Sequence, residues 1–299
     1  LIKNIEELKK IIEEVKIKGL VSIDTETNSL NLEKANLVGI SLSFNEDKGF
    51  YIPINHKDIE SGKRLKEQLE EKKVLEQIRL ICSDPSILKI GQNLKYDIRL
   101  LKKYNISFNS IDDTMLLSYA LDNGLTRHGM DDLSYRHLNH ETIKYKDLVG
   151  TGKKQISFDY VTIDLATKYA AEDALITLKL YNVLKPRLIK EKISYIYEKI
   201  DKPLIDVLSL MEERGIRVDS KYLQKLSKEF LNESNKIEKL IFKITGKEFN
   251  IGSPKQLGEI LFLEMKIKGG KKTKTGTYST DSGILEDLSS QGHEIAKLV

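Results

Sequence analysis

The stretch GLVSIDTETNSL, residues 19–30, begins as a buried β-strand and then places two acids where such a strand normally carries apolar side chains. Val21 and Ile23 alternate with polar residues, and β-branched residues at alternate positions are typical of a half-buried strand. Asp24 and Glu26 follow two residues apart, so their carboxylates leave the same face of the extended chain. Desolvating two like charges side by side is costly unless a positive charge lies between them. The stretch therefore predicts a strand that ends in a charged site with a compensating partner.

The composition is ordinary for a protein that forms a hydrophobic core. The 299 residues are 40% hydrophobic and 31% charged, and this length suits one large domain or two smaller ones. No apolar run is long enough to span a bilayer, so we expect no membrane partner. The chain begins with Leu1 rather than a methionine, which indicates a piece of a longer protein.

Metal ligands in this chain are expected to come mainly from oxygen. Cys82 is the only cysteine, which rules out a disulfide within the chain and a zinc site made of thiolates. The five histidines are scattered and lack the spacing of zinc motifs. Oxygen ligands favour magnesium, manganese or calcium.

The charge distribution leaves two interpretations open. The net charge of +4 is compatible with a nucleic-acid partner but does not require one. Residues 266–274, KIKGGKKTK, hold five lysines and no acid. Such a run is usually a solvated loop, and contact with a nucleic-acid backbone is the alternative.

Hydrophobic patterning indicates an α/β region followed by a helical one. We expect helices at residues 3–16 and about 61–82, strands at 35–44 and 48–54, a strand running into a helix over 87–106, and mostly helices over 112–184. A sheet with helices interleaved around it indicates an α/β domain with a mixed sheet. Beyond a boundary at 184–193 the chain is nearly all helical, and Ser253 is the expected N-cap of one helix there.

Two further polar pairs could join the acids of the first strand. Asn93 and Asp97 are four residues apart, so on a helix they would share a face, with Tyr96 beside them. Tyr169 and Asp173 have the same spacing, with small residues between them. Each pair alone is usually a solvated helix face, because acids are mostly exposed. The informative feature is that the acids of the first strand and these two pairs occur together, in this order along the chain.

The motifs DTET at residues 24–27, NLKYD at 93–97 and YAAED at 169–173 together resemble the 3′→5′ exonuclease module of family A DNA polymerases, in the group named for four acids and a tyrosine. The second half, from PLIDVLSLMEERGIRVD to KKTKTGTYSTD, is similar to the beginning of the polymerase domain in that family. The resemblance covers nearly the whole chain.

The resemblance implies an α/β, ribonuclease H-like 3′→5′ exonuclease fold with a mixed central sheet, followed by a mainly helical, partial thumb subdomain. The exonuclease domain would cover residues 1–190, and the N-terminal part of the polymerase domain would cover 191–299. The palm and fingers motifs are expected downstream of residue 299, so we do not expect this chain to polymerise DNA by itself.

By the same resemblance, Asp24, Glu26, Asp97, Tyr169 and Asp173 would be catalytic, and the four acids would hold two divalent cations, magnesium or manganese. Asp24 would bridge both ions, Glu26 and Asp173 would complete one site, and Asp97 would support the other. Tyr169 would orient the attacking water, since an ordinary tyrosine pKa near 10 suits a hydrogen-bonding group better than a base.

The implied substrate is a DNA 3′ end, held as a single strand, from which nucleoside 5′-monophosphates are released. Its expected contacts are Thr27, Leu30, Gln92, Asn93, Tyr96, Arg127 and Tyr145. Leu30, Tyr96 and Tyr145 would wedge or stack against bases. Ordinary core packing is the alternative for Leu30 and Tyr145, and a plain surface charge is the alternative for Arg127.

The implied partner of the lysine cluster is duplex DNA, contacted by Lys271, Lys272 and Lys274 at a thumb loop. We expect a monomer in the bacterial cytoplasm, associated with the nucleoid. Two other functions stay open: an exoribonuclease of the RNase D type, which shares the three motifs, and a silent scaffold with an exonuclease fold. The scaffold is disfavoured because all four acids and the tyrosine are present.

Overall fold

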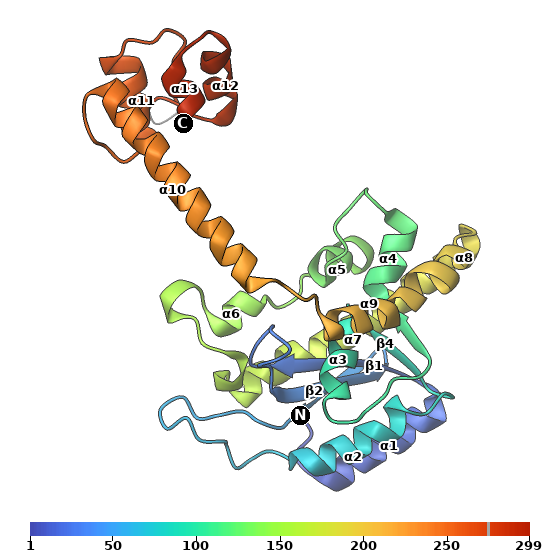
Figure 1. The fold of residues 1–299 in the computed structure, drawn as a ribbon. Helices are drawn as coiled ribbons and strands as arrows, with labels where there is room; N and C mark the ends of the chain where they lie inside the picture. The colour runs from blue at the N-terminus through green and yellow to red at the C-terminus, as the bar shows by residue number, and fades with distance from the viewer. Residues whose placement is uncertain (274–275) are drawn as a thin grey trace. The chain divides into compact units, whose positions relative to one another are not determined.

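The computed structural model describes residues 1–273 and 276–299, and the chain forms two compact units, Leu1–Gly215 and Ile216–Val299. The first unit is built around a sheet and the second is helical (Figure 1). Within the described residues, no helix combines the length and the apolar character needed to cross a membrane.

One mixed sheet of five strands forms the centre of the first unit. In spatial order the strands are β3 (Lys48–Pro53), β2 (Leu37–Asn45), β1 (Leu20–Thr27), β4 (Leu88–Gly91) and β5 (Ile111–Asp113). The pairs β3-β2 and β2-β1 are antiparallel, whereas β1-β4 and β4-β5 are parallel. This arrangement confirms the expected α/β, ribonuclease H-like exonuclease fold with its mixed sheet.

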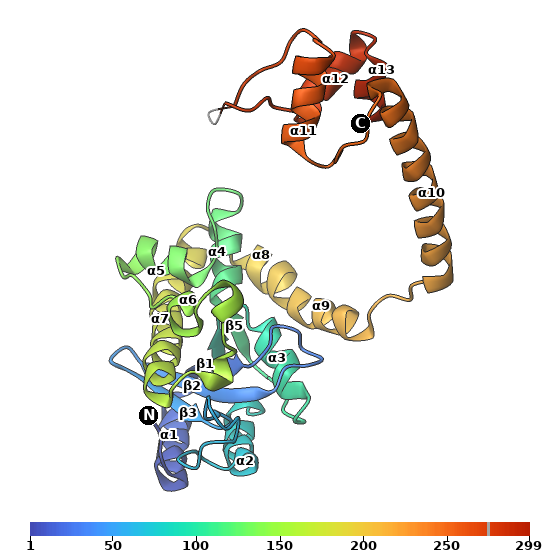
Figure 2. The ribbon, with the colours of Figure 1, turned by 90° about the vertical axis from the view of Figure 1, so that its left-hand side faces the viewer.

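Helices cover both faces of this sheet (Figure 2). On one face, α1 (Ile5–Lys18) and α2 (Glu71–Cys82) bury their apolar stripes against Val21 and Ile23 of β1 in the largest hydrophobic core. The other face is covered by the long helix α7 (Ile163–Lys190), which contacts β1, β2 and β3. Alternate residues of β1 therefore point to different layers, and the acids point toward α7.

The first unit contains six further helices. They are α3 (Lys95–Lys102), α4 (Thr114–Asp122), α5 (Met130–Leu138), α6 (Tyr145–Val149), α8 (Ser194–Ile196) and α9 (Lys202–Arg214). Short 3₁₀ turns lie at Gly152–Lys154 and Phe158–Tyr160, and a π-helical turn, η3 (Tyr197–Asp201), joins α8 to α9. A core of Leu117, Leu133, Leu180, Leu184 and Tyr197 holds α4, α5, α7 and η3 together.

Local signals explain several helix ends. The Asn4 side chain accepts a hydrogen bond from the Glu7 N–H at the start of α1, and Gly19 ends this helix at a φ of +72°. The expected helix over about 61–82 is wrong in its first half, because α2 begins only at Glu71. The preceding residues form a loop that the Arg64 guanidinium holds by donating to the carbonyls of Ile54 and Leu69.

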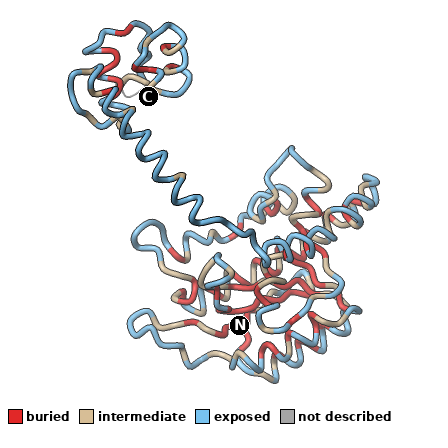
Figure 3. The backbone as a smooth tube through the Cα atoms, viewed as in Figure 1, coloured by how far each residue is buried: buried red, intermediate tan, exposed pale blue. Residues whose placement is uncertain are grey.

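The second unit consists of helices around a small core of its own. It contains α10 (Ser220–Thr245), α11 (Pro254–Glu259), the π-helical turn η4 (Ile260–Glu264), α12 (Ser282–Ser290) and α13 (Glu294–Leu298). The Ser253 side chain accepts a hydrogen bond from the Gln256 N–H, which confirms its role as an N-cap. Figure 3 shows that most of α10 is exposed, and Ile241 is its only fully buried residue.

The division into domains at residues 190 and 191 stays a prediction. The structure shows that α8 and α9, which follow this point, belong to the compact unit that ends at Gly215. Three ion pairs join α9 to α3: Lys95–Glu212, Arg99–Glu212 and Lys102–Glu213.

Candidate active site

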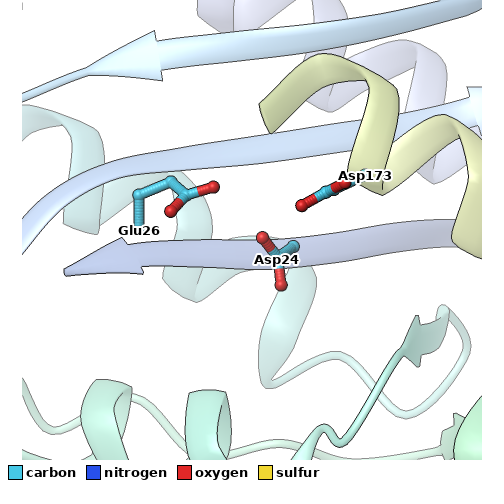
Figure 4. Close-up of side chains that lie close together, drawn as sticks. All are labelled: Asp24, Glu26 and Asp173. Atoms are coloured by element: carbon cyan, nitrogen blue, oxygen red, sulfur yellow. The ribbon is translucent and has the colours of Figure 1, made fainter. Parts of the chain in front are cut away.

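Three of the predicted acids meet between strand β1 and helix α7. Asp24 and Glu26 come from β1 and Asp173 comes from α7, and one carboxylate oxygen of each lies within 4.8 Å of the others (Figure 4). Glu26 and Asp173 are almost fully buried, and Asp24 is partly buried. The Glu26 Oε1 atom is buried without a hydrogen-bond partner among the described residues. We call these three residues and Asp97 the acid cluster.

Small residues allow α7 to approach the sheet closely enough for this meeting. Gly49 of β3 lies against the Ala171 backbone of α7, where a side chain on Gly49 would not fit. Ala170 packs against Tyr51 in the layer between α7 and the sheet. Asp173, two residues further along α7, is thereby brought down to β1.

Asp97 joins the cluster through the part of the β1 backbone that β4 leaves unpaired. Strand β4 pairs with β1 only from Leu20 to Ser22, so the Thr25 N–H lies beyond this pairing. It donates to Asp97 Oδ1 at 3.0 Å, and the Thr25 hydroxyl donates to the same oxygen. Asp97 is 3% exposed, and the structure therefore fixes its carboxylate beside the backbone that carries Asp24.

The acid cluster strongly disfavours full ionisation in the absence of cations. Burial raises the pKa of Asp24 to about 7. Burial also raises the pKa of Glu26 well above its usual range, and the charges of Asp24 and Asp173 add to this effect. The pKa values of Asp97 and Asp173 are raised by burial and by the Asp24 charge.

The donor set fits a hard divalent cation. Within residues 1–273 and 276–299, no lysine or arginine forms an ion pair with any of the four acids. Clustered carboxylates, including an oxygen buried without a partner, are the ligands that magnesium and manganese prefer. The compensating charge that the sequence requires is therefore supplied by no side chain in the described parts of the chain.

Tyr169 lies one helical turn before Asp173 on α7, as the spacing predicts. Its hydroxyl forms a hydrogen bond with the Asp173 side chain that lowers the Asp173 pKa against the larger effect of burial. Burial and the charges of Asp173 and Glu26 raise the pKa of Tyr169 far above its ordinary value. The phenol therefore stays protonated and acts as a donor.

Tyr145 lies in an aromatic group beside Tyr169. Its ring stacks on Phe158 with centroids 6.1 Å apart, and it meets the Tyr169 ring edge-on at the same distance. Because 44% of the surface of Tyr145 is exposed, it is not a core residue, although its ring contacts two other rings. Its ring thus contacts both Phe158 and Tyr169, and part of its surface remains open to solvent.

Tyr96, Thr27 and Leu30 lie together on the Asp97 side of the acid cluster. The Tyr96 hydroxyl lies 2.7 Å from Thr27 Oγ1 and donates to the Ser29 carbonyl at 2.8 Å. These bonds fix the loop that carries Leu30, which is 92% exposed. Core packing, the alternative for Leu30, is therefore ruled out.

Gln92, Asn93 and Arg127 are placed differently from one another. Asn93 does not share a helix face with Asp97, which corrects the expectation, because α3 begins at Lys95 and Asn93 has a left-handed φ of +60°. The Gln92 side-chain amide donates to the His128 carbonyl at 2.9 Å. This bond ties the segment containing the exposed Arg127 to the end of β4.

Lys271 and Lys272 are exposed in the second unit, and Lys274 lies outside the described residues. The Lys272 ammonium lies 5.5 Å from the centroid of the Tyr278 ring. Tyr278 in turn packs on Phe262 with ring centroids 5.0 Å apart. Lys272 thus lies against an aromatic pair that packs in the core of this unit.

Sequence reasoning missed several residues that shape the site. Thr25 lies between two acids, and its hydroxyl is a hydrogen-bond donor that their charges make easy to overlook. The role of Gly49 depends on the close approach of α7, which the sequence does not show. Asp113 precedes an apolar helical run in DDTMLL, a pattern typical of an N-cap, and it accepts bonds from two helices.

Comparison with known proteins assigns both parts of the chain. Residues 1–189 match the family model described as 3′-5′ exonuclease, and residues 220–299 match that of DNA polymerase family A. DNA polymerase I of Rhizobium leguminosarum is 44% identical over 311 residues, which cover 100% of this chain and 31% of the relative. DNA polymerase I of Pseudomonas aeruginosa is 38% identical over 284 residues, which cover 94% of this chain and 31% of the relative.

A solved structure shares the fold. The POL domain of Pol1 from M. smegmatis, in complex with DNA primer-template and dNTP, is 23% identical with a TM-score of 0.67, over 98% of this chain and 45% of that chain. The chain spans about 31% of the length of the curated relatives named above. The chain therefore belongs to the 3′-5′ exonuclease family, and its residues 220–299 are similar to DNA polymerase family A.

Proposed function

We propose that this chain is the metal-dependent 3′→5′ exodeoxyribonuclease module of a DNA polymerase I. It would hydrolyse the terminal phosphodiester at a DNA 3′ end and release nucleoside 5′-monophosphates. The observation that carries the proposal is the meeting of Asp24, Glu26 and Asp173 within 4.8 Å, on the elements that match the exonuclease family.

Two divalent cations, magnesium or manganese, are proposed as cofactors. Asp24, Glu26 and Asp173 would hold one, and Asp24 and Asp97 would hold the other. Bound ions of this kind lower the pKa of a water ligand and neutralise charge on the scissile phosphate. The acids themselves need the cations to become fully ionised, because burial raises the pKa of each one.

Tyr169 would orient the attacking water and not remove its proton. Its pKa is raised by burial and by Asp173, so the hydroxyl stays protonated at neutral pH and can donate. The contact between its ring and Tyr145 holds the phenol at the edge of the acid cluster. Thr25 would keep Asp97 in place while the substrate binds.

The 3′-terminal nucleotides would lie along the Tyr96 side of the cluster. The exposed Leu30 would wedge between bases, Tyr145 would stack on one, and Arg127 would contact a phosphate. Thr27, Gln92 and Asn93 would line the same path. A frayed end costs less to unstack than a paired one, which gives the proposed proofreading its preference for mispaired ends.

The second unit would bind duplex DNA. Lys271, Lys272 and Lys274 would contact the phosphate backbone without reading sequence. The module would act as a monomer on DNA in the bacterial cytoplasm. The match of residues 220–299 to DNA polymerase family A supports DNA, and not RNA, as its nucleic acid.

A cleavage assay tests the proposal. A 5′-labelled single-stranded DNA should shorten stepwise from its 3′ end with magnesium, and chelation should stop the reaction. Asp24→Ala should abolish shortening, whereas Glu14→Ala, at an exposed acid of α1, should leave it unchanged. If the unmutated protein gives no ladder, the scaffold hypothesis replaces this one.

The same assay separates the RNase D alternative. A matched RNA should be shortened much more slowly than the DNA. Equal rates on both strands would contradict the assignment of DNA as the substrate. Equal rates on paired and mispaired 3′ ends would contradict only the proofreading part of the proposal and would leave the exonuclease activity standing.

A further inference from the structure

Asp113, at the end of strand β5, is a buried carboxylate outside the acid cluster that accepts four backbone hydrogen bonds. Its Oδ1 atom accepts from the N–H groups of Met115 at 2.8 Å and Leu116 at 3.3 Å, at the start of α4. The same carboxylate reaches across to the segment before α3. There it accepts from Leu94 N at 2.7 Å and Asn93 N at 3.2 Å.

The bonds to Asn93 and Leu94 matter because α3 has no N-cap side chain of its own. The residue in the N-cap position is Leu94, which has no side-chain acceptor, and the first N–H groups of a helix need one. Asn93 is also held in the left-handed region at a φ of +60°, a conformation that costs energy in a residue other than glycine. Asp113 supplies the missing cap from a different element.

The first turn of α3 carries two residues of the candidate active site. Asp97 is bonded to the Thr25 N–H, and Tyr96 is bonded to Thr27. Both contacts depend on where the helix starts and on its direction, because side chains in a first turn move with the backbone that carries them. A cap that fixes this turn therefore fixes the fourth acid.

We propose that Asp113 is a positioning residue of the active site, which sets the start of α3 and so holds Asp97 against β1 and Tyr96 against Thr27. Its effect on catalysis rests on the proposed exonuclease function. Its effect on α3 does not, since that effect follows from the hydrogen bonds alone.

Asp113 is itself held from behind by the segment that leads out of α7. Its backbone N–H donates to the Tyr197 hydroxyl at 3.0 Å, and this hydroxyl donates to Asp112 Oδ1 at 2.9 Å. Lys185 forms an ion pair with the other Asp112 oxygen at 2.9 Å. Tyr197 is fully buried, so the end of β5 has a fixed orientation.

The competing explanation is that Asp113 serves only as the N-cap of its own helix, α4. Asp113→Ser separates the two roles. A serine is a good N-cap for the helix that it begins, but its side chain is one atom shorter and cannot serve both α4 and the distant Leu94 N–H. Asp113→Asn, which keeps the size of the side chain but removes its charge and one acceptor oxygen, is the second variant.

Amide hydrogen exchange of the metal-free protein measures how firmly the backbone of α3 is held, and it does not depend on activity. In Asp113→Ser, exchange in residues 93–102 should become about tenfold faster, as expected for lost capping bonds, and α4 should keep the parent rate. Asn4→Ala, which removes the N-cap of α1, should change neither region. Unchanged exchange in α3, or equal acceleration in α3 and α4, would overturn the proposal. If the serine variant does not fold, the same measurement on the asparagine variant decides.

Activity gives the second readout. The magnesium concentration for half-maximal cleavage should rise several-fold in Asp113→Ser, and the Asn4→Ala variant should match the parent. An unchanged magnesium requirement together with faster α3 exchange would overturn the link to Asp97. A parent protein that does not cleave DNA would defeat the proposed function but leave the exchange result as the test of positioning.

Discussion

Gly49 of strand β3 lies against Ala171 of helix α7 so closely that a Cβ atom on Gly49 would be 1.9 Å from the Ala171 carbonyl oxygen. Backbone therefore touches backbone where the helix crosses the sheet. Asp173 follows two residues later, and its carboxylate reaches Asp24 and Glu26 across this short distance. The absence of one side chain on β3 thus sets the width of the acid cluster.

Gly49→Ala should damage cleavage more than it damages stability. The methyl group must push α7 or β3 aside, because the atom it meets belongs to the backbone and cannot rotate away. Overpacking of this kind costs about 1–3 kcal/mol of unfolding free energy, and a displaced Asp173 should reduce the cleavage rate about a hundredfold. Urea denaturation and the single-strand assay measure the two effects.

Gly283→Ala is the matched control for this prediction. A Cβ on Gly283, in α12 of the second unit, would come no closer than 3.6 Å to another atom and leaves the first unit unchanged. It should have parent activity. Parent activity in Gly49→Ala as well would show that the approach of α7 does not position Asp173.

Metal-free protein should lose stability as the pH rises from about 4 to about 7. Burial raises the pKa of Asp24 to about 7 in the folded protein, whereas an unfolded aspartate has a pKa near 4. The folded state therefore binds more protons than the unfolded state in this interval, so the unfolding free energy falls with increasing pH. Glu26, Asp97 and Asp173 act in the same direction.

Melting temperatures in chelator at pH 5 and pH 8 measure this loss, and magnesium at pH 8 should restore stability by binding the folded state. Asp24→Asn should make the metal-free protein less sensitive to pH, because an amide does not ionise. Higher stability in chelator at pH 8 than at pH 5 would mean that the folded protein does not raise the pKa values of these acids.

Tyr169→Phe should keep the fold and reduce cleavage about a hundredfold. The phenylalanine ring retains the contacts with Tyr145 and Phe158, and only the hydroxyl bonded to Asp173 is lost. The rate at saturating substrate should fall, with little change in the DNA concentration needed for saturation. Tyr135→Phe, at an exposed tyrosine of α5, is the control, and equal rates for both variants would exclude a role for the Tyr169 hydroxyl.

The sequence predicts those parts of the site that depend on local spacing. The alternation around Val21 and Ile23 requires Asp24 and Glu26 to share the opposite face, because the period of a strand is two. The four-residue spacing of Tyr169 and Asp173 places them on one face of α7 for the same kind of reason. The mixed sheet follows from the order of the elements.

The parts that could not be predicted depend on contacts between distant segments. Asn93 lies before the helix, where its N–H donates to Asp113, twenty residues later, and no local propensity reveals this contact. Asp97 is held by the part of β1 that β4 leaves unpaired. This contact exists because β4 is shorter than β1, and the sequence does not reveal where the pairing of the two strands ends. The lysines and arginine before α2 resemble a charged helix until Arg64 is seen to bind carbonyls of its own loop.

Replacing Lys271 and Lys272 together by alanine should weaken binding of duplex DNA in a salt-dependent way. Each lysine that contacts a phosphate releases about one counterion, so the slope of log affinity against log salt should decrease by about 2 in magnitude. The Lys272 ammonium lies over the Tyr278 ring, which presents it at a defined position and limits its loss of entropy on binding. Binding should weaken equally for unrelated duplex sequences, because phosphates carry no sequence information.

The control must remove the same charge elsewhere. Lys10→Ala with Lys72→Ala changes two exposed lysines on α1 and α2, the helices on the face of the sheet away from the acid cluster. Titrations of a labelled duplex at several salt concentrations should give this double variant the parent slope. Equal slopes for both double variants would show that net charge, and not the lysine cluster of the second unit, attracts the duplex. Cleavage of a single strand should stay at the parent rate in both, since neither pair belongs to the acid cluster.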